Sequence, residues 1–222
     1  MSREDAGMRC IPVTEADIDR ARRLLEMADG FTATIDAMDL VHKKLPGFDL
    51  PTCLVKFAAV NTLYGANVYA AVRMAKHIHH MRLSNTDSLG PDFVDRLSEL
   101  PVEDPDEKFR RFTSFASKFA HFFVRPEKFP ILDSFVEMSL KHHLGKGYSY
   151  QPGERYQRFC ERIERLRECN GLKEVPLRSL DGYLWVEGLW LTWCKNKHKD
   201  KKATINSEIE QLFLEGHYKD GC

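Results

Sequence analysis

Apolar residues recur at helical spacing along almost the whole chain, and this periodicity limits the possible folds more than any other feature of the sequence. After Thr14, one helical face collects the apolar residues Ile18, Ala21, Leu24, Leu25 and Ala28. No segment has the apolar–polar alternation of a strand, and no internal repeat is visible. The sequence therefore predicts an all-α fold, a compact bundle of about eight to ten helices in a single domain of residues 1–222.

Capping residues and helix breakers divide this pattern into separate elements. Thr14 with Asp17 predicts the start of the first helix, and Gly30 its end. The helix that carries Lys118 is expected to begin at Pro105 and Asp106. The remaining helices are expected over 32–44, over 52–82 as two helices or one kinked at Gly65, from Pro91, from Asp133 to the glycines of 145–147, and near 153–169, 179–197 and 205–215.

Charge is balanced over the chain, with 33 Lys and Arg residues against 33 Asp and Glu. Net charge therefore indicates no class of partner, and a polyanion would have to bind a local basic patch. No apolar run approaches the ~18 residues of a membrane span, so we expect no membrane partner. The N-terminal sequence MSREDAGMRC contains acids and no apolar core, so a secretory signal is not expected.

The six cysteines form no C-x-x-C pair and have no histidines at zinc-finger spacing. Scattered free thiols are typical of a reducing compartment. We therefore expect a cytoplasmic protein without a metal or other cofactor.

A lysine stands among phenylalanines in the segment SKFAHFFVRPEKFPILDSFV, residues 117–136. On a helix, Lys118 is a neighbour of Phe115, Phe119 and Phe122. One interpretation is a lysine that packs its methylenes on apolar surface while its charge reaches water. The other is a nucleophile, because desolvation by aromatic rings lowers the pKa of an amine.

An aspartate follows the apolar residues of 130–132 and precedes an amphipathic segment. Asp133 fits a helix N-cap, since its oxygens can accept the free amide groups of the first turn. A carboxylate fixed at that position can also stabilise a developing cation. Capping and catalysis are therefore compatible for this residue.

Together these segments resemble the active-site region of helix-hairpin-helix DNA glycosylases. In that superfamily a lysine on one helix is followed, after a loop, by an aspartate in a Pro-apolar-Asp-Ser/Thr context. Here Lys118 lies 15 residues before Asp133, in the sequence Pro-Ile-Leu-Asp-Ser. Residues 57–78 resemble the early helix pair of the superfamily, with Asn61, Tyr64 and Asn67 in its polar turn. The usual Gly-rich hairpin is replaced by RRFTSFAS, so the resemblance is to divergent members and covers roughly residues 54–144.

The resemblance implies an enzyme that flips a damaged or modified base out of double-stranded DNA and breaks its glycosidic bond. Asp133 would stabilise the oxocarbenium-like sugar, and Lys118 would act as a Schiff-base nucleophile if the enzyme is also a lyase. Residues 54–144 would form the catalytic core, and the helices of 153–222 would close the base pocket. We expect a monomer that serves DNA repair or defence against phage DNA with modified cytosines.

Further residues are expected to contact the base or the DNA backbone. In the resembled superfamily the last helices often line the base pocket, which makes Asp181, Tyr183 and Trp185 candidates. Core packing is the alternative role of the tryptophans in this segment. DNA contacts are expected from Ser117, Arg125 and Lys128, together with the three residues of the polar turn.

Two alternative functions stay open from the residues alone. Arg73 and His79, with five residues between them, have roughly the spacing of an all-α HEPN ribonuclease motif. A helical nucleic-acid-binding protein without catalytic activity is the other alternative. His77 and His80 would suit a metal, but no carboxylate completes the set, so no metal site is predicted.

Overall fold

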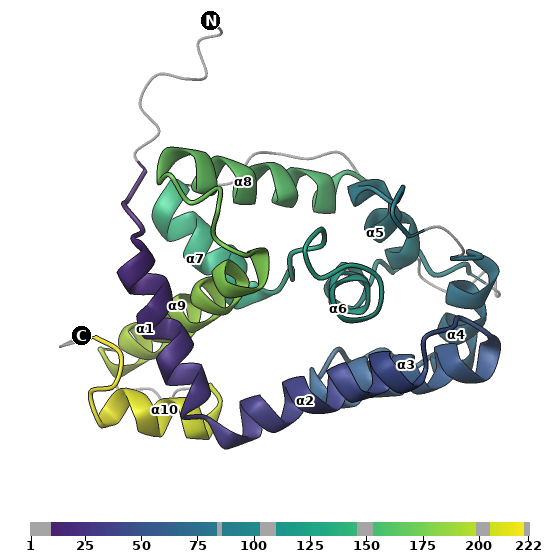
Figure 1. Ribbon diagram of the computed structural model, residues 1–222, viewed down its shortest axis with the longest axis horizontal. Helices are drawn as coiled ribbons and strands as arrows, with labels where there is room; N and C mark the ends of the chain where they lie inside the picture. The colour runs from purple at the N-terminus through teal and green to yellow at the C-terminus, as the bar shows by residue number, and fades with distance from the viewer. Residues whose placement is uncertain (1–9, 84–85, 103–109, 146–152, 199–204, 220–222) are drawn as a thin grey trace, which may run out of the picture. The chain divides into compact units, whose positions relative to one another are not determined.

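The structure is a computed structural model that describes residues 10–83, 86–102, 110–145, 153–198 and 205–219. These residues form ten α-helices and one isolated bridge between Glu99 and Arg111, which confirms the predicted all-α class. Figure 1 shows the helices, which are α1 (Glu15–Glu26), α2 (Asp29–Lys44), α3 (Leu50–Leu63), α4 (Ala71–His80), α5 (Pro91–Ser98), α6 (Thr113–Phe123), α7 (Ser134–Leu144), α8 (Arg155–Cys169), α9 (Leu177–Lys197) and α10 (Ser207–Leu214).

The chain divides into two compact units that interleave along the sequence. Unit 1 consists of residues 1–32, 133–149 and 161–222, and unit 2 of residues 33–132 and 150–160. Both segments of unit 2 are therefore flanked in sequence by segments of unit 1. The division falls inside α2 and α8, and directly before Asp133.

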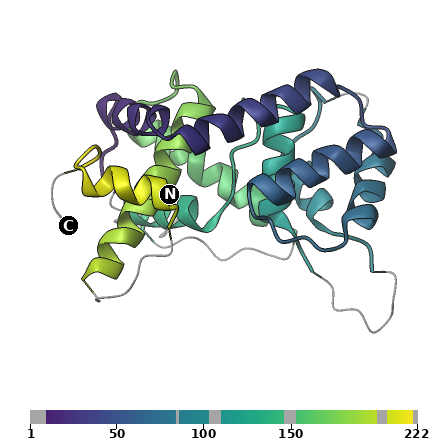
Figure 2. The same cartoon turned by 90° about the horizontal axis from the view of Figure 1, so that it is seen from below.

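In unit 1, helix α9 packs against α1 and α7 (Figure 1). Its C-terminal half joins α10 in an aromatic cluster, where the Trp190 ring centroid lies 5.1 Å from those of Trp193 and Phe213. Figure 2 shows α10, in yellow, beside this half of α9. Both tryptophans are buried, so core packing accounts for them.

A glycine lets α9 approach the first turn of α7 closely. A Cβ on Gly188 would lie 2.1 Å from the backbone oxygen of Phe135, which is far inside van der Waals contact. The two helices can pack this closely only because residue 188 is a glycine and has no side chain.

In unit 2, helix α6 is the centre of the core. Every residue of α6 except Ser114 is buried, and α6 packs against α3 and α5. Its phenylalanines meet rings from the α2–α3 segment, since Phe115 lies 5.2 Å from Phe57 and Phe119 lies 6.3 Å from Phe48, centroid to centroid. An apolar helix of this kind is stable only when its neighbours cover it on nearly all sides.

Two predicted helix boundaries are wrong. Helix α1 ends at Glu26, and Gly30 lies in the first turn of α2, where its N–H donates to the Glu208 carboxylate at 3.1 Å. Helix α6 begins at Thr113, because Arg111 pairs with Glu99 and the Phe112 N–H donates to the Ser98 carbonyl oxygen at 2.9 Å. These bonds hold the preceding backbone out of the helix. The predicted start at Pro105 and Asp106 lies outside the described residues.

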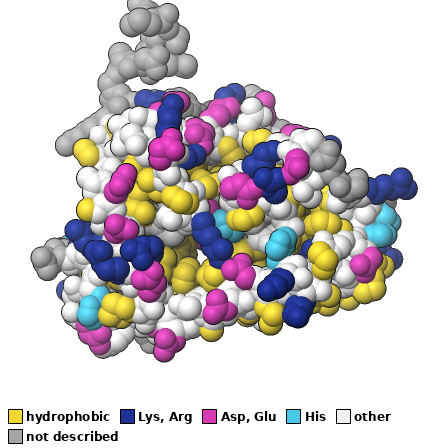
Figure 3. Space-filling model, viewed as in Figure 1, with side chains coloured by type: hydrophobic (Ala, Val, Ile, Leu, Met, Phe, Trp, Pro, Cys, Tyr) yellow, Lys and Arg dark blue, Asp and Glu magenta, His cyan; other side chains and the backbone are white. Residues whose placement is uncertain are grey.

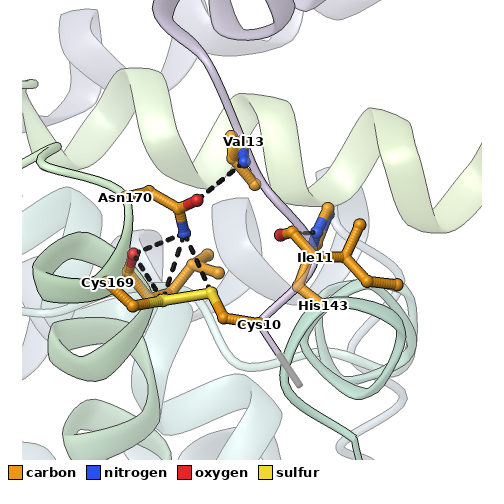
Figure 4. Close-up of a disulfide and its surroundings, with 7 residues drawn as sticks. Cys10, Ile11, Val13, His143, Cys169 and Asn170 are labelled. Carbon is orange, nitrogen blue, oxygen red and sulfur yellow. Dashed lines mark hydrogen bonds between the residues drawn. A yellow bond between two sulfur atoms is a disulfide. The ribbon is translucent and has the colours of Figure 1, made fainter.

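The cysteines are not all free thiols, which corrects the sequence-based expectation. A disulfide joins Cys10 to Cys169, at the end of α8, and Cys194 is also disulfide-bonded, whereas Cys53 and Cys160 are free. Figure 4 shows the arm before α1 held at the disulfide, where Asn170 accepts a hydrogen bond from the Val13 N–H at 2.8 Å. The cysteines of the disulfide are 159 residues apart, so no local spacing pattern reveals the pair.

Replacing Gly188 with alanine should destabilise the protein by about 2 kcal/mol or more. The new methyl group would overlap the Phe135 backbone, and moving two packed helices apart outweighs the ~1 kcal/mol that alanine gains over glycine in helix propensity. Urea denaturation followed by circular dichroism measures the loss.

Gly182→Ala, on the same helix, is the matched control. A Cβ there would meet only the Leu25 Cδ1 atom at 3.2 Å, and a side-chain methyl can move aside. We expect a change within about 1 kcal/mol. Equal losses in the two variants would show that the α7–α9 contact is not tight at Gly188.

Candidate functional site

Lys118 is nearly buried on α6, with 7% of its surface exposed. Its Nζ atom lies 5.7 Å from the centroid of the Tyr64 ring, and this ring packs on Phe122 at 5.0 Å. The predicted aromatic setting of the lysine is therefore present. The role of Lys118 as a nucleophile stays a prediction.

The polar turn between α3 and α4 has a defined backbone held by its asparagines. The Asn61 side-chain oxygen accepts the Val68 N–H at 2.8 Å, and the Asn67 amide donates to the Gly65 carbonyl oxygen at 2.9 Å. Gly65 and Asn67 both have left-handed backbone angles, with φ of 56° and 54°. This turn places Tyr64, the C-cap of α3, beside α6.

Asp133 is the N-cap of α7, as predicted. Its Oδ1 atom accepts the N–H groups of Phe135 and Val136, both at 3.0 Å. These bonds fix the carboxylate at the positive end of the helix. Asp133 begins a segment of unit 1 whereas Lys118 belongs to unit 2, so their meeting in one site stays a prediction.

Polar groups of α6 and α8 hold the segment that leads to Asp133. Ser117 Oγ accepts the Leu132 N–H at 3.0 Å, and His121 Nδ1 donates to the Phe129 carbonyl oxygen at 2.9 Å. The Tyr156 hydroxyl donates to the Pro130 carbonyl oxygen at 2.8 Å. Ser117, predicted to contact DNA, is fully buried, and its hydroxyl positions this segment.

The two predicted phosphate ligands lie on a turn that is bonded to a neighbouring loop. The Arg125 guanidinium pairs with Asp87 and Glu127, and the Lys128 amine donates to the carbonyl oxygens of Asp87 and Leu89, at 2.5 and 3.2 Å. Arg125 is half-buried and Lys128 is exposed. Ion pairs near the surface are weak, so the Arg125 pairs could exchange for phosphate contacts.

The three predicted base-pocket residues lie on α9 inside unit 1. Asp181 and Tyr183 are buried, and the Trp185 ring stacks on Phe31 at 5.4 Å. The Tyr183 hydroxyl lies 3.0 Å from His143 Nε2, while His143 Nδ1 donates to the Ile11 carbonyl oxygen. Because that carbonyl can only accept, Nε2 is the nitrogen that accepts the tyrosine hydrogen. Burial raises the pKa of Tyr183 and lowers that of His143.

A second buried lysine, which sequence reasoning missed, lies on α3. Lys56 is fully buried, its Nζ atom donates to the Gly47 carbonyl oxygen at 2.9 Å, and it lies 4.0 Å from the centroid of the Phe48 ring. Burial lowers the pKa of this amine to about 8. The available signal was the segment TCLVKFAAV, which surrounds Lys56 with apolar residues as α6 surrounds Lys118.

Next to this lysine, unit 2 contains a pocket of about 640 Å³. The Gly47–Phe48 backbone and the Phe123 ring, which lies 5.2 Å from Lys56 Nζ, belong to its wall. Its polar side chains are His42, His79, Arg82 and Thr86, and its other apolar residues are Pro46, Leu83 and Val124. We call it the unit 2 pocket.

The ionisable residues that line the unit 2 pocket, His42, His79 and Arg82, are all basic. Asp39 and Asp49 interact with the two histidines from outside the lining. Burial and the nearby Lys56 amine lower the pKa of His42. On the face shown in Figure 3, by contrast, the described Lys and Arg side chains alternate with Asp and Glu. A local basic site of this type is what a chain with no net charge needs to bind an anion.

The two residues of the ribonuclease alternative, Arg73 and His79, both lie on α4. At ~100° per residue they are about 120° apart around the helix axis, and their joint role stays a prediction. His79 Nδ1 donates to the Phe48 carbonyl oxygen at 2.9 Å.

Within the described ranges, no three His, Cys, Asp or Glu side chains are grouped as metal ligands. The same part of the chain contains no helix with the length and hydropathy of a membrane span.

The family model HI_0787_N, described as an N-terminal domain, matches residues 17–128, slightly more than half of the chain. The chain belongs to this family. The HI_0787_N match includes Lys56, Lys118 and all residues that line the unit 2 pocket, and it ends before Asp133. Searches among curated proteins and among solved structures find no match.

Lys56→Met should change how stability depends on pH. The folded state holds the amine at a pKa of about 8 against 10.5 for an ordinary lysine, so the unfolded state binds more protons between these values. Wild-type stability therefore gains a contribution as pH rises above 8, which the variant lacks. The difference in free energy of unfolding between variant and wild type should shift by about 1 kcal/mol between pH 7 and pH 9.

Urea denaturation at the two pH values measures this shift. The range stops at pH 9 because the Cys53 thiol, whose pKa burial raises from 9.0 to about 11, interacts with Lys56 and would titrate differently in wild type and variant above it. Lys76→Met, which removes an exposed lysine from α4, controls for the loss of a positive charge. A difference that stays constant for Lys56→Met would contradict the buried position of the amine.

Proposed function

We propose that the chain is a DNA glycosylase that flips a damaged or modified base from double-stranded DNA and breaks its glycosidic bond. The observation that carries the proposal is the contact of Lys118 with Tyr64, whose ring centroid lies 5.7 Å from Nζ. This contact joins the two segments on which the resemblance to helix-hairpin-helix glycosylases rests, the turn after α3 and helix α6.

In the proposed reaction the neutral amine of Lys118 attacks C1′ of the flipped nucleotide, and the base leaves with the electrons of the glycosidic bond. Opening of the sugar ring gives an imine, from which the 3′ phosphate is eliminated. Water then hydrolyses the imine and restores the amine. In a monofunctional enzyme, water would attack C1′ instead and leave an abasic site.

Asp133 has the role of stabilising the cationic sugar in either variant of the reaction. Two amide hydrogen bonds hold its Oδ1 atom, so the carboxylate needs little reorganisation when charge develops.

We also propose that the protein acts as a monomer in the cytoplasm, in repair or in defence against phage DNA. The Cys10–Cys169 disulfide argues against a cytoplasmic location, because disulfides persist mainly in oxidising compartments. Alkylation of thiols in intact cells before lysis, followed by mass spectrometry, measures whether the pair is oxidised where the protein works.

Borohydride reduction should trap a covalent complex between the protein and a duplex that carries its modified base. A panel of duplexes, each with one modified base, identifies the substrate, and Lys118→Ala should abolish the cross-link. Asp133→Asn should lower the rate of base release by about 100-fold or more, with a small effect on stability, because asparagine also caps helices.

Two variants make this test selective. Lys56→Met should keep the cross-link, since it removes a lysine that is buried elsewhere in the described part of unit 2. Asp49→Asn alters the corresponding cap of α3 and should keep base release. A cross-link that survives Lys118→Ala, or base release unaffected by Asp133→Asn, would refute the assignment of these residues. Abasic sites without a cross-link would identify the monofunctional reaction.

A further inference from the structure

The ionisable side chains that line the unit 2 pocket are basic. Two acids outside this lining interact with them, Asp39 with His42 and Asp49 with His79, and Asp49 also interacts with Lys56. Its ionisable lining side chains are His42, His79 and Arg82, and no acidic residue is among the described residues that line it. Behind the wall, the Lys56 amine donates to a backbone carbonyl, and no carboxylate within the described part of the chain forms an ion pair with it. The pocket therefore favours an anion.

The rest of the wall is apolar and aromatic. Phe48 and Phe123 both line the pocket, with Leu83 and Val124 beside them. A volume of about 640 Å³ is within the usual range for small-molecule sites and is much larger than a single phosphate requires. A ligand that fits this wall has a flat apolar part as well as an anionic group.

We propose that the unit 2 pocket binds a nucleoside phosphate, with the base against the half-buried Phe48 and the phosphate at His42, His79 and Arg82. The ligand is either a free mononucleotide or the terminal nucleotide of a single strand, which share this chemistry. The proposal uses residues that have no part in the Lys118 reaction, so it does not depend on the glycosylase function.

Hydrogen bonds hold the wall of the pocket in place before a ligand arrives. The Phe48 carbonyl oxygen accepts from His79 Nδ1 at 2.9 Å and from the Cys53 thiol at 3.2 Å. Because Nδ1 is the donor, Nε2 is the nitrogen of His79 that would contact a phosphate oxygen. A wall fixed to both α3 and α4 reduces the entropy lost on binding.

Proton uptake should accompany binding. The charges around His42 are Lys56, which lowers its pKa, and Asp39, which raises it, and Asp49 interacts with His79. A phosphate bound beside His42 would add negative charge next to its ring and favour the protonated form. Affinity for the phosphate should therefore increase as pH falls from 8 to 6, and the mononucleotide should lose affinity as salt concentration rises.

Isothermal titration calorimetry with the full chain at pH 6.5 tests the proposal. The probes are AMP, dTMP, adenosine, inorganic phosphate and a 5′-phosphorylated single-stranded tetranucleotide. AMP or dTMP should bind about tenfold or more tightly than adenosine and than phosphate alone. Tighter binding of the tetranucleotide than of both mononucleotides identifies a strand end as the ligand, and weaker binding identifies a free nucleotide.

Arg82→Gln and His42→Gln should each weaken mononucleotide binding by about tenfold or more, since a charged hydrogen bond to phosphate is lost. Arg82 is exposed, so its replacement leaves the core intact. Arg22→Gln on α1 is the matched control, because it removes an exposed arginine of unit 1 and should leave binding unchanged.

Three results would overturn the proposal. The first is that no nucleotide binds at millimolar concentration. The second is that adenosine or phosphate binds as tightly as AMP. The third is that the Arg82 and His42 variants bind the mononucleotide as tightly as wild type. Borohydride trapping with Arg82→Gln distinguishes a failure of this proposal from a failure of the glycosylase proposal. The variant should lose nucleotide binding but still form the cross-link through Lys118.

Discussion

The burial of α6 determines how unit 2 is organised. A helix with ten buried positions must be covered by rings and methyl groups from its neighbours, and the phenylalanines of α6 meet partners on α3 and in the loop before it. The few polar groups on such a helix need partners inside the protein. Ser117 and His121 bond to the backbone of 129–132, so the apolar helix also fixes the segment that ends at Asp133.

The two buried lysines belong to different sides of this helix. Phe122 and Lys118 lie near Tyr64, whereas Phe119 and Phe123 lie near Phe48 and Lys56. The Lys56 amine lies near the Phe48 and Phe123 rings and the Lys118 amine near the Tyr64 ring, and such rings attract a cation but hydrate it poorly. One helix therefore separates a site proposed for covalent chemistry from a pocket proposed for an anion, and substitutions can address each of them alone.

The sequence predicts helix ends well where the hydrogen bonds that determine them come from neighbouring residues. Thr14 and Asp133 cap their helices as expected, because a cap depends on a few neighbouring residues. The start of α6 was missed, since Arg111 and Phe112 are held by partners near Ser98 and Glu99. The Cys10–Cys169 pair and the Gly30–Glu208 bond escape a local pattern for the same reason. Lys56 was overlooked although its neighbours are as apolar as those of Lys118, because a lysine in an apolar helix indicates burial only once the surrounding wall is known.

The disulfide turns much of the chain into a covalent ring. Every residue from 11 to 168, which includes all of unit 2, lies between Cys10 and Cys169 along the backbone. Such closure restricts the unfolded chain of both units. A protease that cuts once inside this ring opens it without releasing a fragment, so the nicked molecule keeps its full mass until a reductant separates the pieces.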